Sequence, residues 1–137
     1  MKTGLFGGTF DPIHFGHILP VKEARLELGL DRVIYLPTAI PPHKPDGQTA
    51  PPHSRWTMVE LALLSEPGLV ADPYELTPGR EAFTVDSVEH FQAEMPDDEL
   101  FLIIGGSKSD VMNRPSAEST VGLTWAVQKV HVHTDVI

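Results

Sequence analysis

The sequence of 137 residues contains no cysteine. This absence excludes a disulfide framework, a thiol nucleophile and thiolate-bound zinc. The sequence also lacks a run of the roughly 18–20 apolar residues that a membrane span needs. Its first residues lack the apolar core of about 7–15 residues that is typical of a secretory signal. Together these absences predict a soluble, cytoplasmic protein.

Basic residues are scarce, with 10 Lys and Arg against 19 Asp and Glu and a formal net charge of −9. This balance argues against a nucleic-acid partner, because binding to a phosphate backbone depends on many cations that release counterions. A nucleotide is compatible with it, since a few cations and helix-terminal N–H groups bind phosphate through the local field. We therefore expect a small-molecule partner rather than a nucleic acid or a membrane.

The pattern of apolar residues predicts a single α/β domain over residues 1–137. A short apolar run at 3–6 is followed by glycines, by helically spaced apolar residues at 19–28 and by a β-branched segment at 32–36, which together read as a βαβ unit. The continuous apolar run at 100–104 is typical of a strand covered on both faces. We expect an open parallel sheet with helices on both faces.

The other segments are less regular. Six of the sixteen residues from 37 to 52 are proline, which predicts a long surface loop. Further expected elements are a helix capped by Ser54, a weak strand at 69–71, a helix capped by Thr84 that ends near Pro96, a strand or helix at 121–127, and a strand at 130–134.

A glycine-rich segment at residues 7–17 lies between the first strand and the first helix. In open α/β sheets this end of a parallel strand is where ligands bind. Gly7 and Gly8 allow backbone N–H groups to approach an anion, and Thr9 adds a hydroxyl donor. The segment therefore predicts a phosphate-binding loop.

Two histidines stand three residues apart at the start of the expected helix, His14 and His17. At this spacing their rings can lie on one side and direct N–H donors to the same oxygens. Gly16 leaves room for a nucleobase or ribose. A plain turn followed by a pair of helix-start histidines, or of metal ligands, is the alternative that these residues leave open.

The whole string from Gly7 to His17 resembles the signature of the HxGH nucleotidylyltransferase superfamily, and its form is most similar to the nicotinate-mononucleotide adenylyltransferase family. The resemblance extends from residue 1 to about 106, and residues 107–137 diverge. Four further segments carry it: Pro41-Pro42-His43-Lys44; Arg55 with Met58 and Ala62; Glu75 through Arg80 with Phe83, Thr84 and Asp86; and Ile103-Ile104-Gly105-Gly106.

The resemblance implies a Rossmann-like fold and the transfer of AMP from ATP to nicotinate mononucleotide, which yields the deamido-NAD dinucleotide and pyrophosphate. The nucleophile is a phosphate that is already anionic, so positioning and charge neutralisation suffice without a general base. Magnesium is carried by ATP, with no metal held by the protein. The implied residues are His14 and His17 for catalysis; Gly7, Gly8, Thr9, Phe10, Gly16 and Gly105 for ATP and its phosphates; and Lys44, Arg55, Phe83 and Thr84 for the substrate, with Lys44 and Arg55 as mobile cations.

Two departures from the family pattern concern ATP. Ser107 stands where the family has an aspartate, and the family's C-terminal Ile-Ser-Ser-Thr-x-Ile-Arg segment has no counterpart. They predict weak or undetectable transfer with residual nucleotide binding. The alternatives are a truncated, non-catalytic nucleotide-binding remnant, or another HxGH transferase such as a phosphopantetheine adenylyltransferase or a cytidylyltransferase. The loop at 41–44 and Phe83-Thr84 favour nicotinate mononucleotide, while the oligomeric state stays open.

Overall fold

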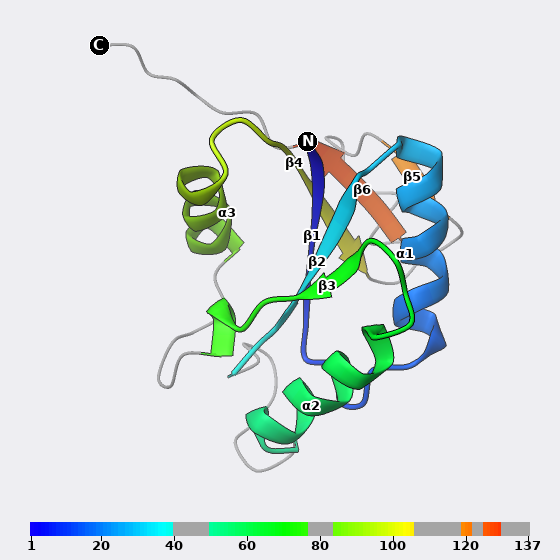
Figure 1. Ribbon diagram of the computed structural model, residues 1–137, viewed down its shortest axis with the longest axis vertical. Coiled ribbons are helices and arrows are strands. Elements are labelled where there is room, and N and C mark those ends of the chain that lie inside the picture. Colours follow the sequence, from blue (N-terminus) through cyan, green and yellow to red (C-terminus); the bar gives the residue numbers. More distant parts are fainter. Residues whose placement is uncertain (40–49, 77–83, 106–118, 122–124, 130–137) are drawn as a thin grey trace.

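A computed structural model describes residues 1–39, 50–76, 84–105, 119–121 and 125–129 (Figure 1). In chain order the elements are β1 (Lys2–Gly8), α1 (Phe15–Leu28), β2 (Arg32–Pro37), α2 (Pro52–Leu63), β3 (Leu69–Ala71), the 3-10 helix η1 (Tyr74–Leu76), α3 (Thr84–Glu94), β4 (Glu99–Gly105), β5 (Ser119–Val121) and β6 (Trp125–Lys129). The βαβ unit expected from the N-terminal pattern corresponds to β1, α1 and β2. Residues 40–49 of the surface loop expected at 37–52, and the strand expected at 130–134, lie outside the described residues.

The strands form one sheet in the order β3-β2-β1-β4-β6-β5. β1 pairs in parallel with β2 and β4, and β2 pairs in parallel with β3. The predicted open parallel sheet is therefore confirmed for these four strands. β6 pairs antiparallel with β4 and with β5, so that the segment left open as strand or helix contributes an antiparallel pair at one edge.

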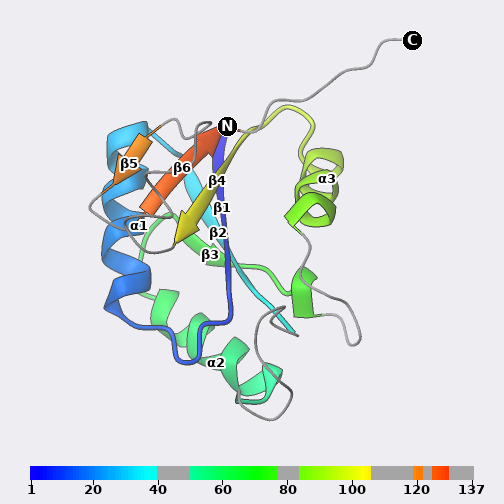
Figure 2. The same ribbon diagram turned by 180° about the vertical axis from the view of Figure 1, so that it is seen from behind.

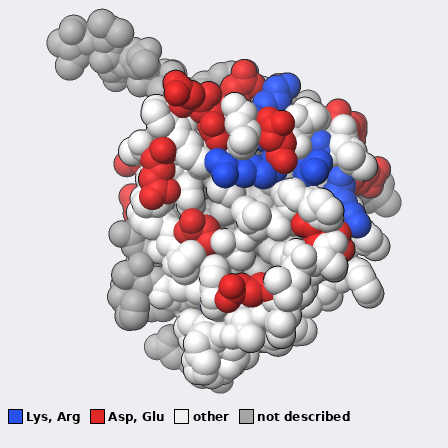
Figure 3. Space-filling view, in the orientation of Figure 1, with Lys and Arg blue, Asp and Glu red and all other residues white. Residues whose placement is uncertain are grey.

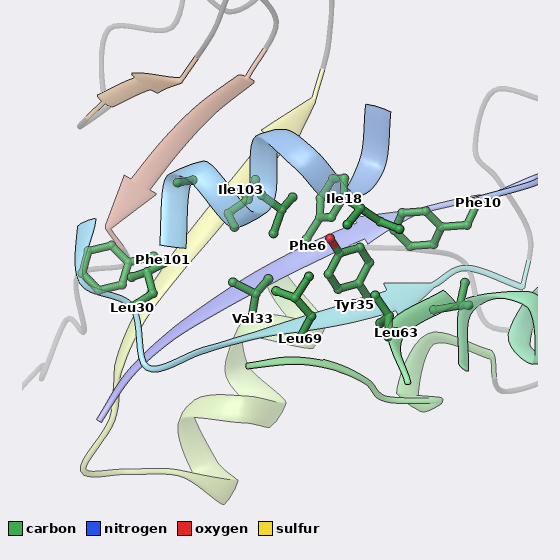
Figure 4. Close-up of a cluster of buried hydrophobic side chains, with 13 residues drawn as sticks. Phe6, Phe10, Ile18, Leu30, Val33, Tyr35, Leu63, Leu69, Phe101 and Ile103 are labelled. Carbon is green, nitrogen blue, oxygen red and sulfur yellow. The ribbon is translucent and has the colours of Figure 1, made fainter. Parts of the chain in front are cut away.

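Helices cover both faces of the sheet, as expected (Figures 1 and 2). Successive strand residues point to opposite faces, and this alternation divides the core in two. On one face Phe6, Val33 and Tyr35 pack with residues of α1 and α2 (Figure 4). On the other face Leu5 and Ile34 belong to a cluster that includes Phe91 of α3. Both faces of the central strands are thus buried in apolar side chains.

The ends of two helices show what the local sequence decides. α1 ends before Gly29, which adopts the left-handed conformation with φ 65° and so closes the helix as the sequence predicted. α2 begins at Pro52 and not at Ser54. Proline is favourable in the first turn, because its missing N–H would have no helical partner there. This preference moves the start of α2 two residues ahead of the expected cap.

Charged side chains are unevenly distributed over the molecule. In the view of Figure 3 the lysine and arginine side chains gather in the upper half, whereas the lowest part, over α2, is mostly uncharged. At the amino ends of the strands Asp98 accepts hydrogen bonds from Thr3 (2.9 Å) and Arg32 (3.1 Å). Burial opposes the charge of Asp98, but these hydrogen bonds, the N-terminal ammonium and Arg32 hold its pKa below the ordinary value. No helix in the described part of the chain is long and apolar enough to span a membrane.

Candidate active site

The glycine segment leaves the sheet at the point where the strand order reverses. From β1 the chain passes to β2 and β3 on one side, and it later returns to β4 on the other. The pairing of β1 with β2 continues to Gly8, whereas its pairing with β4 ends at Leu5, opposite Leu102. Ligands of open α/β sheets bind in the crevice at such a switch point. The segment after β1 therefore lies where a nucleotide site is expected.

His14 and His17 cap the first turn of α1 reciprocally. The N–H of Gly16 donates to Nδ1 of His14 at 3.0 Å, and the N–H of His14 donates to Nδ1 of His17 at 3.0 Å. Because an acceptor nitrogen carries no proton, the neutral form of each ring has its proton on Nε2. The two rings lie against each other with centroids 3.9 Å apart. The structure thus brings both histidines together and leaves each an Nε2–H donor.

His17 is half-buried, and this burial decides its charge. Burial first, and the neighbouring His14 second, lower the pKa of His17 from 6.5 to about 4. Its ring meets the ring of Phe10 edge-on, with centroids 5.1 Å apart. At neutral pH His17 therefore offers an uncharged N–H group rather than a cation.

The lowered pKa of His17 makes a prediction about stability in acid. A base whose pKa in the folded state, about 4, lies below its ordinary value of 6.5 stabilises the fold fully above that ordinary value and loses the contribution as the pH falls toward 4. We expect His17→Ala to lose less stability than the wild type between pH 7 and pH 4, as measured by urea denaturation. Asp98 also favours the fold at higher pH, but it does so in both proteins. Equal losses in the two proteins would contradict the assignment.

Gly16 is required by the histidine beside it. A Cβ atom built on Gly16 would lie 2.8 Å from Cε1 and 2.9 Å from Nδ1 of the His14 ring. The sequence suggested that Gly16 leaves room for a nucleobase or ribose, and the structure supplies a nearer reason. Any side chain at this position would push the His14 imidazole off the first turn of α1.

We therefore expect Gly16→Ala to displace His14 and to lower kcat/KM for the reaction proposed below by roughly 10–100-fold, the scale of a misplacement near 1 Å. Steady-state kinetics measures the loss, and circular dichroism checks the fold. Gly29→Ala is the matched control, because a Cβ at Gly29 meets nothing within 4 Å but carries the strain of φ 65°. Gly29→Ala should lose stability and keep its activity. Unchanged kinetics in Gly16→Ala would show that the reaction does not depend on the observed position of the His14 ring.

The remaining loop residues differ in what they expose. Phe10 has a positive φ of 49° and a ring only 2% exposed, so only its backbone can face a ligand. A Cβ on Gly8 would lie 3.2 Å from that ring, and one on Gly7 would lie 3.8 Å from the carboxylate of Glu75. Thr9 is partly buried. Packing against Phe10 is thus a second reason for glycine at position 8, besides an approach by phosphate, whereas a Cβ at position 7 would make only an ordinary contact.

Arg55 is fixed in place, which corrects the expectation of a mobile cation. Its side chain is completely buried. The guanidinium donates to the backbone carbonyl oxygens of Ala50 (2.9 Å), Thr9 (2.8 Å), Thr38 (2.6 Å) and Ala39 (3.3 Å). These carbonyls belong to the segment just before α2, the loop after β1 and the residues after β2. Arg55 therefore braces three segments of the candidate site.

Several predicted positions are described only in part. Lys44, Phe83 and Ser107 lie outside the described residues. Thr84 is the first residue of α3, and Gly105 ends β4, where it pairs with Trp125. Their roles stay predictions. In the described ranges no three His, Asp or Glu side chains are grouped as a metal site would require.

A buried carboxylate near the loop has a place that sequence reasoning did not assign. Glu75 was quoted only as part of a family-like segment, yet its side chain is 6% exposed and accepts a hydrogen bond from the Ser87 hydroxyl at 2.6 Å. The N–H of Ala39 donates to its backbone carbonyl. Glu75 thus links η1, α3 and the end of β2 beside the glycine loop. The signal in the sequence that could have identified Glu75 as a buried carboxylate is its place between Tyr74 and Leu76.

The fold and site together define a class of protein: an open α/β domain with a glycine loop and a pair of mutually capping histidines at the switch point of its sheet. Comparison with known families agrees, since a family model described as cytidylyltransferase-like matches residues 5–135. The chain belongs to the cytidylyltransferase-like family. The relationship to nucleotidylyltransferases predicted from the sequence is thereby confirmed.

Curated relatives include two proteins named as probable nicotinate-nucleotide adenylyltransferases. The one from Bacillus pumilus is 43% identical over 104 residues, which cover 76% of this chain and 55% of the relative. The one from Rubrobacter xylanophilus is 39% identical over 109 residues, which cover 79% of this chain and 51% of the relative. The chain spans about half the length of the curated relatives that it matches.

Two similar solved structures come from Plasmodium falciparum. Both are described as nicotinic acid mononucleotide adenylyltransferase, one complexed with APC and one with NaAD. The first is 13% identical with a TM-score of 0.64, and it covers 82% of this chain and 53% of that protein. The second is 16% identical with a TM-score of 0.64, over 82% of this chain and 57% of that protein. The likeness confirms the predicted Rossmann-like fold.

Proposed function

We propose that this domain transfers AMP from ATP to nicotinate mononucleotide and releases pyrophosphate. The observation that carries the proposal is the pair of capped histidines, His14 and His17, whose Nε2–H groups are left for a ligand at the switch point of the sheet. The names of the curated relatives and of the similar structures support this choice of substrates.

The reaction needs few groups from the protein. A phosphate oxygen of nicotinate mononucleotide attacks the α-phosphorus of ATP, a new P–O bond forms, and the bond to pyrophosphate breaks as the electron pair leaves with it. Because the nucleophile is already anionic, no proton must be removed. The imidazole donors and the N–H groups of residues 7–10 would stabilise the charge on the phosphates. The start of α1 adds the positive end of its dipole.

Magnesium enters this proposal with ATP. Besides imidazole and backbone N–H donors, which bind phosphate oxygens, the described loop contains one carboxylate, Asp11, and this carboxylate accepts a hydrogen bond from the N–H of Ala50 at 3.1 Å. Mg²⁺ prefers oxygen ligands and retains water, and the triphosphate itself supplies such ligands. We therefore assign the metal to the nucleotide substrate and no metal ligand to the protein.

The other predicted residues keep their proposed roles around this centre. Gly105 ends β4 and Gly8 ends β1, so both lie at the carboxyl ends of neighbouring parallel strands, which supports a position of Gly105 near ATP. Thr84 is the first residue of α3, which covers the face of the sheet opposite α1, and Phe83 precedes Thr84 in the sequence. Phe83 and Thr84 would line the nicotinate pocket. Lys44 would supply the mobile cation for a phosphate.

The deciding experiment is an assay of pyrophosphate release with ATP and nicotinate mononucleotide, run beside calorimetry with each nucleotide alone. We expect both nucleotides to bind and deamido-NAD to form only when both are present. The departures at Ser107 and beyond predict a rate well below that of the Bacillus pumilus relative, which serves as positive control. Binding without any product would favour the non-catalytic alternative. Product only from CTP, or only with phosphopantetheine, would favour another transferase of the same fold.

A further inference from the structure

Tyr35 reaches the candidate site from a strand that does not carry the loop. It lies on β2 opposite Phe6 of β1. Its side chain is completely buried, and its hydroxyl donates a hydrogen bond to the backbone carbonyl oxygen of His17 at 2.6 Å. β2 is therefore joined directly to the first turn of α1, at His17, the second residue of the histidine pair.

The same tyrosine belongs to the aromatic wall on which His17 rests. The ring of Tyr35 lies 5.2 Å from that of Phe6 and 5.6 Å from that of Phe10, measured between centroids. The His17 ring lies 5.1 Å from Phe10 and 6.4 Å from Phe6. Figure 4 shows Phe6, Phe10 and Tyr35 grouped around Ile18 of α1. The backbone and the ring of His17 are thus held by one buried group of side chains.

We propose that Tyr35 is a positioning residue that holds the first turn of α1, so that the His17 imidazole stays against Phe10 with Nδ1 on the His14 N–H and Nε2–H left for the ligand. The value of this placement for catalysis rests on the proposed function. The placement itself does not, because it is carried by the contacts of Tyr35 and His17.

The electrostatic surroundings keep this tether in one state. Burial, and then the charge of Glu66, raise the pKa of Tyr35 above its ordinary value, so its hydroxyl remains a donor at neutral pH. Glu66 follows α2 and pairs with Lys22 of α1 at 2.8 Å. His14 acts on His17 from the same turn. Glu66 and His14 are thus the charged or titratable groups that shift the pKa values of Tyr35 and His17 in the described part of the chain.

Tyr35→Phe tests the tether, because it removes the hydroxyl and keeps the ring. In protein with ¹⁵N-labelled histidine, we expect the His17 titration midpoint to rise from about 4 toward 6.5, since a ring released from the wall is better hydrated. His17→Ala assigns the signal. In the transfer assay we expect kcat to fall roughly 5–10-fold with the KM for ATP within about twofold, as for a loss of orientation rather than of binding.

Tyr74→Phe is the matched control, because Tyr74 is the second of the 2 tyrosines and lies on η1, with its ring stacked on His90 at 3.7 Å. It should leave the His17 titration unchanged. An unchanged titration in Tyr35→Phe, or an equal shift in Tyr74→Phe, overturns the proposal. A wild type without transfer activity would count against the proposed function alone, since the titration does not depend on turnover.

A second measurement needs no variant. The Tyr35 hydroxyl proton is buried and bonded to the His17 carbonyl, so in wild-type protein it should exchange slowly and show a nuclear Overhauser contact to the amide protons of the first turns of α1. A rapidly exchanging hydroxyl without such contacts would overturn the tether even if Tyr35→Phe failed to fold.

Discussion

His14→Ala and His17→Ala should each lower kcat/KM for adenylyl transfer by roughly 10²-fold or more, the usual cost of removing one preorganised donor from a developing negative charge. Each variant removes an Nε2–H group, and each also removes one half of the reciprocal cap on α1. Pyrophosphate release under steady-state conditions measures the loss, with circular dichroism as the check on folding. A folded variant that turns over at the wild-type rate would refute the assignment.

The double variant separates catalysis from packing. Because the two rings touch and each accepts a hydrogen bond from a backbone N–H of the same helix start, their contributions are coupled, and the loss in His14→Ala/His17→Ala should be smaller than the product of the single losses. His90→Ala is the control, since His90 lies on α3 and stacks on Tyr74. It should leave kcat/KM within about twofold of the wild type, because His90 is a partly buried residue that contacts neither histidine of the pair. Where turnover is too slow to measure, ATP affinity by calorimetry provides the same comparison.

The parts of the molecule that were predicted correctly are the elements that depend on the pattern of neighbouring residues in the sequence. The β-branched segment that became β2 and the apolar run that became β4 are each an unbroken stretch of mostly apolar residues, as is typical of a strand covered on both faces. The place of the glycine segment between a strand and a helix is confirmed for the same reason, while its role as a phosphate loop stays a prediction. Its residue types, and not its long-range partners, indicate a phosphate loop.

The features that escaped prediction depend on contacts between distant segments. A sequence shows that Arg55 is charged, but not that backbone carbonyls from three segments surround it. It likewise does not show that Tyr35 donates to His17, eighteen residues away in the chain. The antiparallel strands β5 and β6 also escaped, because their short segments carry too little periodicity to distinguish a strand from a helix.

Arg55→Lys should destabilise the fold by about 3–5 kcal/mol, a large loss for a substitution that keeps the charge. The guanidinium fork reaches the carbonyl oxygens of Thr9, Thr38 and Ala50 at once from a fully buried position. A lysine ammonium has fewer donors in a different geometry, so buried carbonyls would be left without partners at about 1–3 kcal/mol each. Urea denaturation at pH 7 measures the difference.

The same variant distinguishes a brace from a phosphate ligand. If Arg55 braces the loops, Arg55→Lys that is kept folded at low temperature should lose kcat through loop misplacement while the KM for nicotinate mononucleotide changes little. If Arg55 contacts the substrate, that KM should rise and the free energy of unfolding should stay near the wild-type value. Arg25→Lys is the control, because Arg25 is only partly buried and its Nε has no hydrogen-bond partner among the described residues. Its loss should stay within about 1 kcal/mol, since no carbonyl group depends on that Nε.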